Sequence, residues 1–227
     1  MSFEDLQKSL KISFKNDSLL KQAFIHRSYL NETKLTLESN ERLEFLGDSI
    51  LSFLISDYLY KTFPQLPEGS LTSLRSAVVN TKSLADCAKT LFLGKLLKLS
   101  RGEDEGGGRE NISILADTFE ALIGAIYLDT DLKTVKRITL THLTPRLKEV
   151  IENKTYKDPK STFQEVVQEK LRISPTYKVI KEVGPDHSKI FTVGVFVADT
   201  LYGTGQGKNK QEGEQNAASH ALAAWLK

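Results

Sequence analysis

The segment 112–128 constrains the fold most, because it is almost wholly apolar and its only charges are Asp117 and Glu120. No stretch of the chain reaches the roughly 18 consecutive apolar residues that a membrane span needs, so this pattern predicts a helix in a protein core. The two acids lie at i and i+3 and share one face of that helix. A buried carboxylate is costly without a cationic partner, and neither acid has Lys or Arg four residues later. A positive charge must therefore come from elsewhere.

A second set of acids lies on the predicted helix 40–63, where Glu41, Glu44 and Asp48 occupy one face at i, i+3 and i+7. These acids can be exposed or paired with distant arginines. Alternatively, the two helices meet and form one all-oxygen cluster, made of Glu44, Asp48, Asp117 and Glu120. Such a cluster suits Mg²⁺ or Mn²⁺ and not zinc. A di-iron carboxylate bundle would want Glu-x-x-His pairs, and no histidine has Glu three residues before it.

The first 150 residues are predicted to be mostly helical. Along 40–63, apolar residues recur at spacings of three and four, with Ser39 or Asn40 as a capping residue at the start. The other predicted helices are 70–79, 81–92, 111–128 and 131–150. Residues 101–110, RGEDEGGGRE, are too polar and glycine-rich to pack, and they lack the ending of a nucleotide phosphate loop. We expect them to form a flexible connection.

The last third of the chain has a different pattern. Residues 152–160 carry no periodic apolar pattern and indicate a linker. After it the sequence predicts a helix, three strands rich in Val, Ile, Phe, Tyr and Thr, and an alanine-rich helix. Their predicted bounds are 161–172, 176–183, 189–197, about 200–204, and 212–226. The second part is therefore predicted to be an α-β-β-β-α domain.

The net charge of +2 becomes informative only when it is divided along the chain. Residues 1–153 carry a net charge of −1 and the remainder +3, which is a mild indication of an anionic partner for the C-terminal part. The single cysteine, Cys87, excludes an intrachain disulfide and a cysteine-built zinc site. No secretory signal is visible, so we expect a cytoplasmic protein without a membrane partner.

Four stretches carry recognisable motifs: NERLEFLGDS (40–49), FIHRSYLNE (24–32), PEGSLTSLRSAVVN (67–80) and LADTFEALIGAIYLD (115–129). Together they resemble bacterial ribonuclease III, an endonuclease that cuts double-stranded RNA. The resemblance implies an all-helical nuclease domain followed by a small α-β-β-β-α double-stranded-RNA-binding domain. The expected limits are 1–151 for the nuclease domain, 152–157 for the linker and 158–227 for the RNA-binding domain.

The resemblance also implies roles for the acids. Glu44, Asp117 and Glu120 would coordinate Mg²⁺, for which Mn²⁺ can substitute, as one or two ions per site. Asp48 would help to organise the attacking water, and Asp48 and Glu120 would be the catalytic acids. Products would carry a 5′-phosphate and a 3′-hydroxyl with short 3′ overhangs, and the substrates would include precursor rRNA and mRNA.

Further residues are assigned by the resemblance outside the metal site. Glu41 and Glu68 resemble acids of the same valley that do not touch the metal, and one of them can come from each subunit of a homodimer. A structural or interface role explains both equally well. Phe45 resembles the residue of the nuclease domain that enters a socket on the partner subunit, with an ordinary core position as the alternative.

In the RNA-binding part, the first helix and two later segments resemble the surfaces that bind an RNA duplex by its shape, phosphates and 2′-hydroxyls. The implied contacts are Thr162, Gln164, Glu165, Gln168, His187, Lys208 and Lys210. Near the last helix the sequence departs from the usual pattern, with Gln211 in place of a second lysine, Gly213 in place of alanine, and the opposing charge of Glu212. We expect weaker phosphate binding there.

Two other functions compete with a Mg²⁺-dependent, homodimeric endoribonuclease. A non-catalytic binder of duplex RNA would have no need for unpaired acids in an apolar helix. An unrelated carboxylate-metal enzyme with an added RNA-binding domain does not account for NERLEFLGDS.

Overall fold

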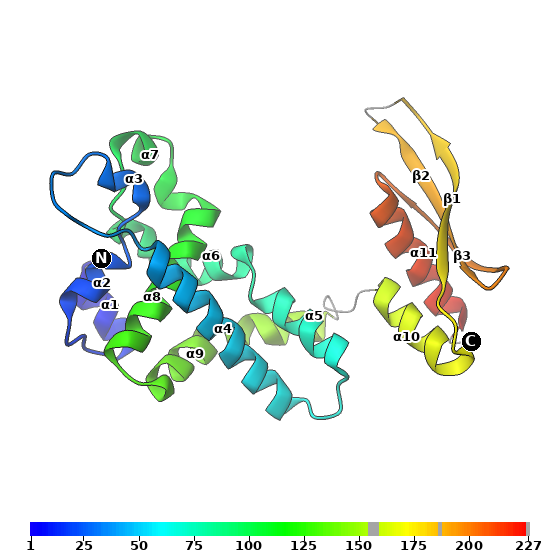
Figure 1. The fold of residues 1–227 in the computed structure, drawn as a ribbon, viewed down its shortest axis with the longest axis horizontal. Helices are drawn as coiled ribbons and strands as arrows, with labels where there is room; N and C mark the ends of the chain where they lie inside the picture. The colour runs from blue at the N-terminus through cyan, green and yellow to red at the C-terminus, as the bar shows by residue number, and fades with distance from the viewer. Residues whose placement is uncertain (154–158, 186–187, 226–227) are drawn as a thin grey trace. The chain divides into compact units, whose positions relative to one another are not determined.

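The computed structural model describes residues 1–153, 159–185 and 188–225. The chain divides into two compact units, Met1–Lys154 and Thr155–Lys227 (Figure 1). Of the helices in the described ranges, none is both long enough and apolar enough to cross a bilayer.

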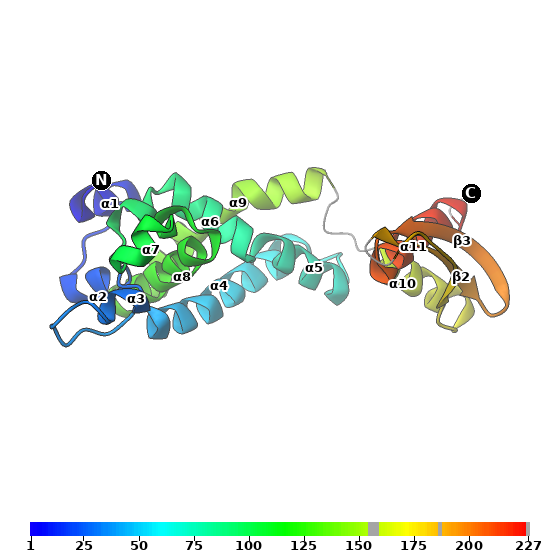
Figure 2. The same ribbon diagram turned by 90° about the horizontal axis from the view of Figure 1, so that it is seen from above.

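Helices make up the first unit, as predicted. Helix α8 is its central element and packs against α4 and α6; Figure 2 shows α4 and α8 side by side. The elements are α1 (Phe3–Leu10), α2 (Asp17–Gln22), α3 (Arg27–Leu30), α4 (Glu41–Thr62), α5 (Glu68–Val78), α6 (Thr81–Thr90), the 3-10 turn η1 (Leu93–Leu96), α7 (Arg101–Glu105), the 3-10 turn η2 (Gly108–Glu110), α8 (Ile112–Asp129) and α9 (Leu132–Glu152).

Side chains of the residues before these helices explain where several of them begin. Asn80, Asn111 and Asp131 accept hydrogen bonds from backbone N–H groups in the first turns of α6, α8 and α9. The capping prediction for α4 is wrong. Asn40 precedes α4, but its buried side chain donates to the carbonyl of Ala23 (3.5 Å) and caps nothing. The Ser39 hydroxyl donates instead to the carboxylate of Glu41 (2.8 Å).

The prediction of a flexible connection over 101–110 is wrong, because this segment folds into α7 and η2. The Arg109 guanidinium donates to both carboxylate oxygens of Asp104 (2.7 Å each) and to the carbonyls of Gly94 and Leu97 (3.0 Å each). Gly108 is buried against this turn. The hydrogen bonds of Arg109 thus hold this segment in place, as apolar packing does in the other helices.

The second unit has the predicted α-β-β-β-α order. Its three strands form an antiparallel sheet in the order β1-β2-β3. The elements are α10 (Pro159–Leu171), β1 (Thr176–Val183), β2 (Ile190–Val197), β3 (Thr200–Gly207) and α11 (Lys210–Trp225). Both helices pack against each other, and α11 also covers β2 and β3. The core joins Phe163 and Val167 of α10, Val195 of β2, and Ala217 and Ala221 of α11.

Candidate metal centre and RNA-binding surface

Two glycines allow the acid-bearing helices to touch along their backbones. A β-carbon at Gly47 of α4 would overlap the carbonyl group of Glu120, and one at Gly124 of α8 would overlap the carbonyl of Leu43. Only glycine permits so close an approach. The contact places the first turns of α4 beside the middle of α8, where Asp117 lies one turn before Glu120.

Three acids meet at this contact. Glu44, Asp117 and Glu120 each present a carboxylate oxygen, and these oxygens lie within 4.8 Å of one another. All three side chains are half-buried. Mg²⁺ binds oxygen ligands at about 2.1 Å, so oxygens at this spacing can reach one ion with small side-chain movements. The donor set contains oxygen only, which fits Mg²⁺ or Mn²⁺.

The site is electrostatically strained as a set of bare carboxylates. Burial, reinforced by Asp48, Asp117 and Glu44, raises the pKa of Glu120 to about 8. Burial also raises the pKa of Glu44, with further contributions from Asp117, Glu41 and Asp48, and burial raises the pKa of Asp117. These shifts mean that the ionised cluster is disfavoured until a cation or protons neutralise it.

Asp48 lies at the edge of this group. It is exposed, and it is not among the three acids whose oxygens converge. Its charge nevertheless contributes to the raised pKa of both Glu44 and Glu120, so Asp48 lies near these two acids. The four acids singled out by spacing therefore gather at one place, with Asp48 on the solvent side.

In the second unit, α10 separates a core face from a solvent face. Phe163 and Val167 are buried, whereas Gln164, Glu165 and Gln168 are exposed. The Gln168 amide donates to the Ser174 hydroxyl (2.9 Å). Thr162, also expected to bind RNA, is half-buried.

The two lysines expected to meet phosphates also face solvent. Lys208 and Lys210 are exposed at the start of α11. Helix N-termini favour anions, so this position suits phosphate. His187 lies outside the described residues.

Comparisons with known proteins agree with this architecture. The Ribonuclease-III-like family model matches residues 16–147, and the double-stranded RNA binding motif matches residues 159–224. The protein named Ribonuclease 3 from Caldanaerobacter subterraneus subsp. tengcongensis is 45% identical over 218 residues, which cover 96% of each chain. The chain belongs to the ribonuclease III family. The resemblance drawn from the sequence motifs is thus confirmed.

Other members of the ribonuclease III family lead to the same conclusion. Ribonuclease 3 from Borreliella burgdorferi is 44% identical over 216 residues, covering 95% of this chain and 88% of the relative. A solved structure of the ribonuclease III nuclease domain from Campylobacter jejuni is 40% identical, with a TM-score of 0.60. It covers 64% of this chain and 98% of its own, and it was described for structural flexibility in a region involved in dimer formation.

The motif FIHRSYLNE brings two further side chains to the acidic residues, and spacing alone had given neither of them a role. The Arg27 guanidinium lies 3.7 Å from the carboxylate of Glu41 and acts to lower the pKa of Glu44. A positive charge on His26 acts to lower the pKa of Asp117. Their positions follow from backbone contacts: the N–H of Asn40 donates to the carbonyl of Ile25 (2.8 Å), and the N–H of His26 donates to that of Lys98 (3.1 Å).

Neighbouring groups fix the orientation of the His26 ring. Its Nδ1 accepts a hydrogen bond from the backbone N–H of Ser28 (3.3 Å) and lies 2.8 Å from the Ser28 hydroxyl. That hydroxyl accepts from the N–H of Ser100 (3.0 Å), so its own proton is free for Nδ1. A neutral ring therefore carries its proton on Nε2. Only the motif FIHRSYLNE could have indicated His26, because His26 and Asp117 lie on different segments and helical spacing cannot relate them.

The two remaining acids lie apart from the three that converge. Glu41 is exposed and pairs with Arg27. Glu68 begins α5 and accepts a hydrogen bond from the Thr72 hydroxyl (2.9 Å). Between Glu44 and Thr62, α4 extends for about 27 Å at 1.5 Å per residue, and Glu68 follows its far end. Within one chain Glu68 is thus not among the acids that converge.

Two of the three departures noted near α11, Glu212 and Gly213, have structural functions. Glu212 accepts a hydrogen bond from the backbone N–H of Lys208 (2.7 Å), and its own N–H donates to the side chain of Asn209 (2.8 Å). A β-carbon on Gly213 would lie 2.7 Å from a methyl of Val193. Gly213 therefore lets α11 approach the sheet, and Glu212 holds the helix start together. Packing therefore explains Gly213, and hydrogen bonds at the helix start explain Glu212.

Proposed function

We propose that Glu44, Asp117 and Glu120 hold a catalytic Mg²⁺ ion, for which Mn²⁺ can substitute. The observation that supports this most directly is the convergence of their carboxylate oxygens within 4.8 Å in a half-buried site. When bound, the ion supplies a more acidic water and neutralises charge on the scissile phosphate. The proposal is for one or two such ions per site.

The chain is an endoribonuclease of double-stranded RNA, in keeping with its family and with its two domain matches. It hydrolyses phosphodiester bonds and leaves 5′-phosphate and 3′-hydroxyl ends with short 3′ overhangs. In our proposal Asp48, on the solvent side, accepts a hydrogen bond from the attacking water. Glu120, whose pKa of about 8 lets it hold a proton near neutral pH, gives up that proton when the cation binds.

We propose a homodimer formed through the nuclease domain, with Phe45 at its interface. In the single chain the Phe45 side chain is 78% exposed, and Phe53 and Tyr60 are exposed on the same helix. Their separations of eight and seven residues keep all three within about 80° around α4, which makes one apolar strip. An exposed apolar strip of this kind is typical of an interface. A dimer would also allow Glu68 to approach the acidic site of the partner.

The RNA-binding domain would hold the duplex through the exposed side of α10 and the start of α11. In this proposal Thr162, Gln164, Glu165 and Gln168 contact 2′-hydroxyls, and Lys208 and Lys210 contact phosphates. A minor-groove contact by His187 is part of the same prediction. The domain limits, 1–151 and 158–227 with a linker at 152–157, stay predictions, as do precursor rRNA and mRNA as substrates and a cytoplasmic location.

A cleavage assay tests the metal site. Duplex RNA is incubated with the parent chain, Glu120→Gln and the control Glu38→Gln, each with Mg²⁺, Mn²⁺ or Ca²⁺. Glu38 is an exposed acid that pairs with Arg42, outside the converging group. We expect Glu120→Gln to lower cleavage at least about 100-fold while duplex binding persists, and the control to cleave normally.

Three results would change the proposal. Full cleavage by Glu120→Gln would remove this residue from the metal site. Binding without cleavage by the parent under every condition would support the alternative of a non-catalytic RNA binder. Equal loss in Glu38→Gln would show that the effect is general to acids on this surface.

A further inference from the structure

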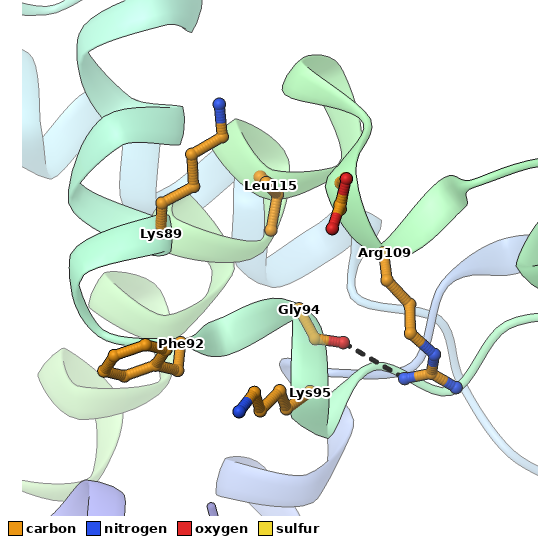
Figure 3. Close-up of a pocket in the computed structure, with 7 residues that line it drawn as sticks. Lys89, Phe92, Gly94, Lys95, Arg109 and Leu115 are labelled. Carbon is orange, nitrogen blue, oxygen red and sulfur yellow. Dashed lines mark hydrogen bonds between the residues drawn. The ribbon is translucent and has the colours of Figure 1, made fainter.

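A hollow lies in the first unit, between α6, η1, η2 and α8. Its volume is about 490 Å³, which is in the size range of small-molecule sites. Figure 3 shows Lys89, Phe92 and Lys95 along one edge, with Arg109 on the opposite edge. Leu115 contributes an apolar wall from α8. Because Leu115 and Asp117 are two residues apart, they point about 200° apart around α8, so the hollow is separate from the acidic site.

Phe92 is the most unusual residue of this pocket. It follows Leu91, the C-cap residue of α6, and has a left-handed backbone conformation (φ 53°, ψ 32°), where glycine or asparagine is normally preferred. Its ring is also 57% exposed. Neither backbone preference nor burial accounts for phenylalanine at this position. The Lys95 ammonium lies 5.3 Å from the ring centroid, so the ring can offer its other face to a ligand.

The free charges of the pocket are chiefly positive. Lys89 and Lys95 are exposed, and neither forms an ion pair within the described part of the chain. The Arg109 guanidinium is already engaged by Asp104 and by the carbonyls of Gly94 and Leu97, so it forms a rigid wall (Figure 3 shows its bond to Gly94). Glu110 supplies a single exposed carboxylate at the rim.

We propose that this pocket binds a nucleoside monophosphate group, with its base stacked on Phe92 and its phosphate bound by the flexible side chains of Lys89 and Lys95. Stacking on an exposed aromatic ring accepts any base, because every base has a π-face. Lysine is a common phosphate partner, and Glu110 can accept hydrogen bonds from ribose hydroxyls or a base amino group. The group can come from a free mononucleotide or from an unpaired end of an RNA strand. The proposal does not depend on the function of the acidic site.

Titration calorimetry on the full chain tests this proposal with four probes: AMP, adenosine, inorganic phosphate, and a single-stranded RNA dinucleotide with a 5′-phosphate. Phe92→Gly removes the ring and relieves the left-handed backbone, so it is expected to fold. Lys89→Gln and Lys95→Gln test the phosphate contacts. Lys82→Gln is the matched control, since Lys82 is an exposed lysine on the same helix, α6.

We expect AMP or the dinucleotide to bind, and to bind more tightly than adenosine or phosphate alone. Phe92→Gly should weaken this binding by roughly 5-fold or more, as the loss of one stacked base does. Each lysine variant should weaken binding of the phosphorylated probes, whereas Lys82→Gln should not. Binding of the dinucleotide without AMP would assign the pocket to an RNA end, and binding of AMP to a free nucleotide. The proposal would be overturned if neither AMP nor the dinucleotide bound, or if Phe92→Gly bound them as tightly as the parent. The cleavage assay tests the acidic site independently of this result.

Discussion

Gly47 of α4 lies against the backbone of Glu120 of α8, so closely that a β-carbon at position 47 would overlap the Glu120 carbonyl. Glu120, whose pKa is shifted furthest among the acids of the site, thus lies where the two helices approach most closely. The separation of α4 and α8 sets the separation of Glu44 from Asp117 and Glu120. The acidic site exists because glycine is present at this crossing.

The first prediction concerns this crossing. Gly47→Ala should lower the free energy of unfolding by roughly 1–3 kcal/mol, since helix α4 must move away from α8. Cleavage and Mn²⁺ affinity should fall with it, because Glu44 moves away from Glu120. Urea unfolding and a metal titration measure the two effects. Gly102→Ala is the control, since a β-carbon there meets no atom within 4 Å. Wild-type stability of Gly47→Ala would contradict the proposed contact.

The second prediction is a pH dependence. The pKa of Glu120 is raised to about 8, above the value of 4.5 expected in an unfolded chain. Between these values the folded protein holds more protons than the unfolded chain, so the unfolding free energy of the metal-free protein should fall as pH rises through this window. Mg²⁺ needs the carboxylate, so its apparent affinity should rise with pH and its binding should release protons.

Calorimetry in two buffers of different ionisation enthalpy measures the released protons, and thermal unfolding with and without Mg²⁺ measures the stabilities. Glu120→Gln should lose most of the proton release, because the amide does not titrate. A Mg²⁺ affinity that stayed constant from about pH 6 to about pH 8 would rule out this coupling.

The third prediction concerns RNA binding at the start of α11. Lys210→Ala should weaken duplex binding and reduce the slope of log affinity against log salt by about one, as expected for one lost phosphate contact. Filter binding or fluorescence anisotropy at several salt concentrations gives the slope. Lys181→Ala is the control, being an exposed lysine of β1 in the same unit. If both variants kept the parent slope, Lys210 would not contact phosphate.

The fourth prediction concerns Phe45. Phe45→Ala should weaken the dimer by roughly 30-fold, which corresponds to the loss of an interface anchor worth about 2 kcal/mol. Sedimentation equilibrium measures the dissociation constant, and cleavage at low protein concentration should fall in parallel. Ile180→Ala removes a comparably exposed apolar side chain (52%) from the other unit and should leave the dimer intact. An unchanged dissociation constant for Phe45→Ala would exclude Phe45 from the interface.

Local patterns predicted the elements well where one period dominated. The Val, Ile, Tyr and Thr content of 176–183 predicted β1 with the bounds observed, and the apolar run at 112–128 predicted α8 to within one residue. Apolar periodicity failed to predict secondary structure where polar side-chain contacts, and not apolar packing, hold the segment. Residues 101–110 fold because Arg109 binds Asp104 and two carbonyls, and no periodicity records such a contact. Phe53 fits the apolar periodicity of α4, yet it is 56% exposed. Periodicity shows which side of a helix is apolar, but not whether another element packs against that side.

The acidic residues themselves were determined by the sequence, because two charges in an otherwise apolar helix are visible without coordinates. The motifs also identified the family, which the comparisons confirmed. The tertiary structure decided which acids converge, leaving Asp48 at the edge and Glu41 beside Arg27. It also brought His26 and Arg27 to the site through the backbone contacts of Ile25 and His26. The physical reason is that spacing fixes directions around one helix, whereas distances between helices depend on contacts as specific as Gly47 against Glu120.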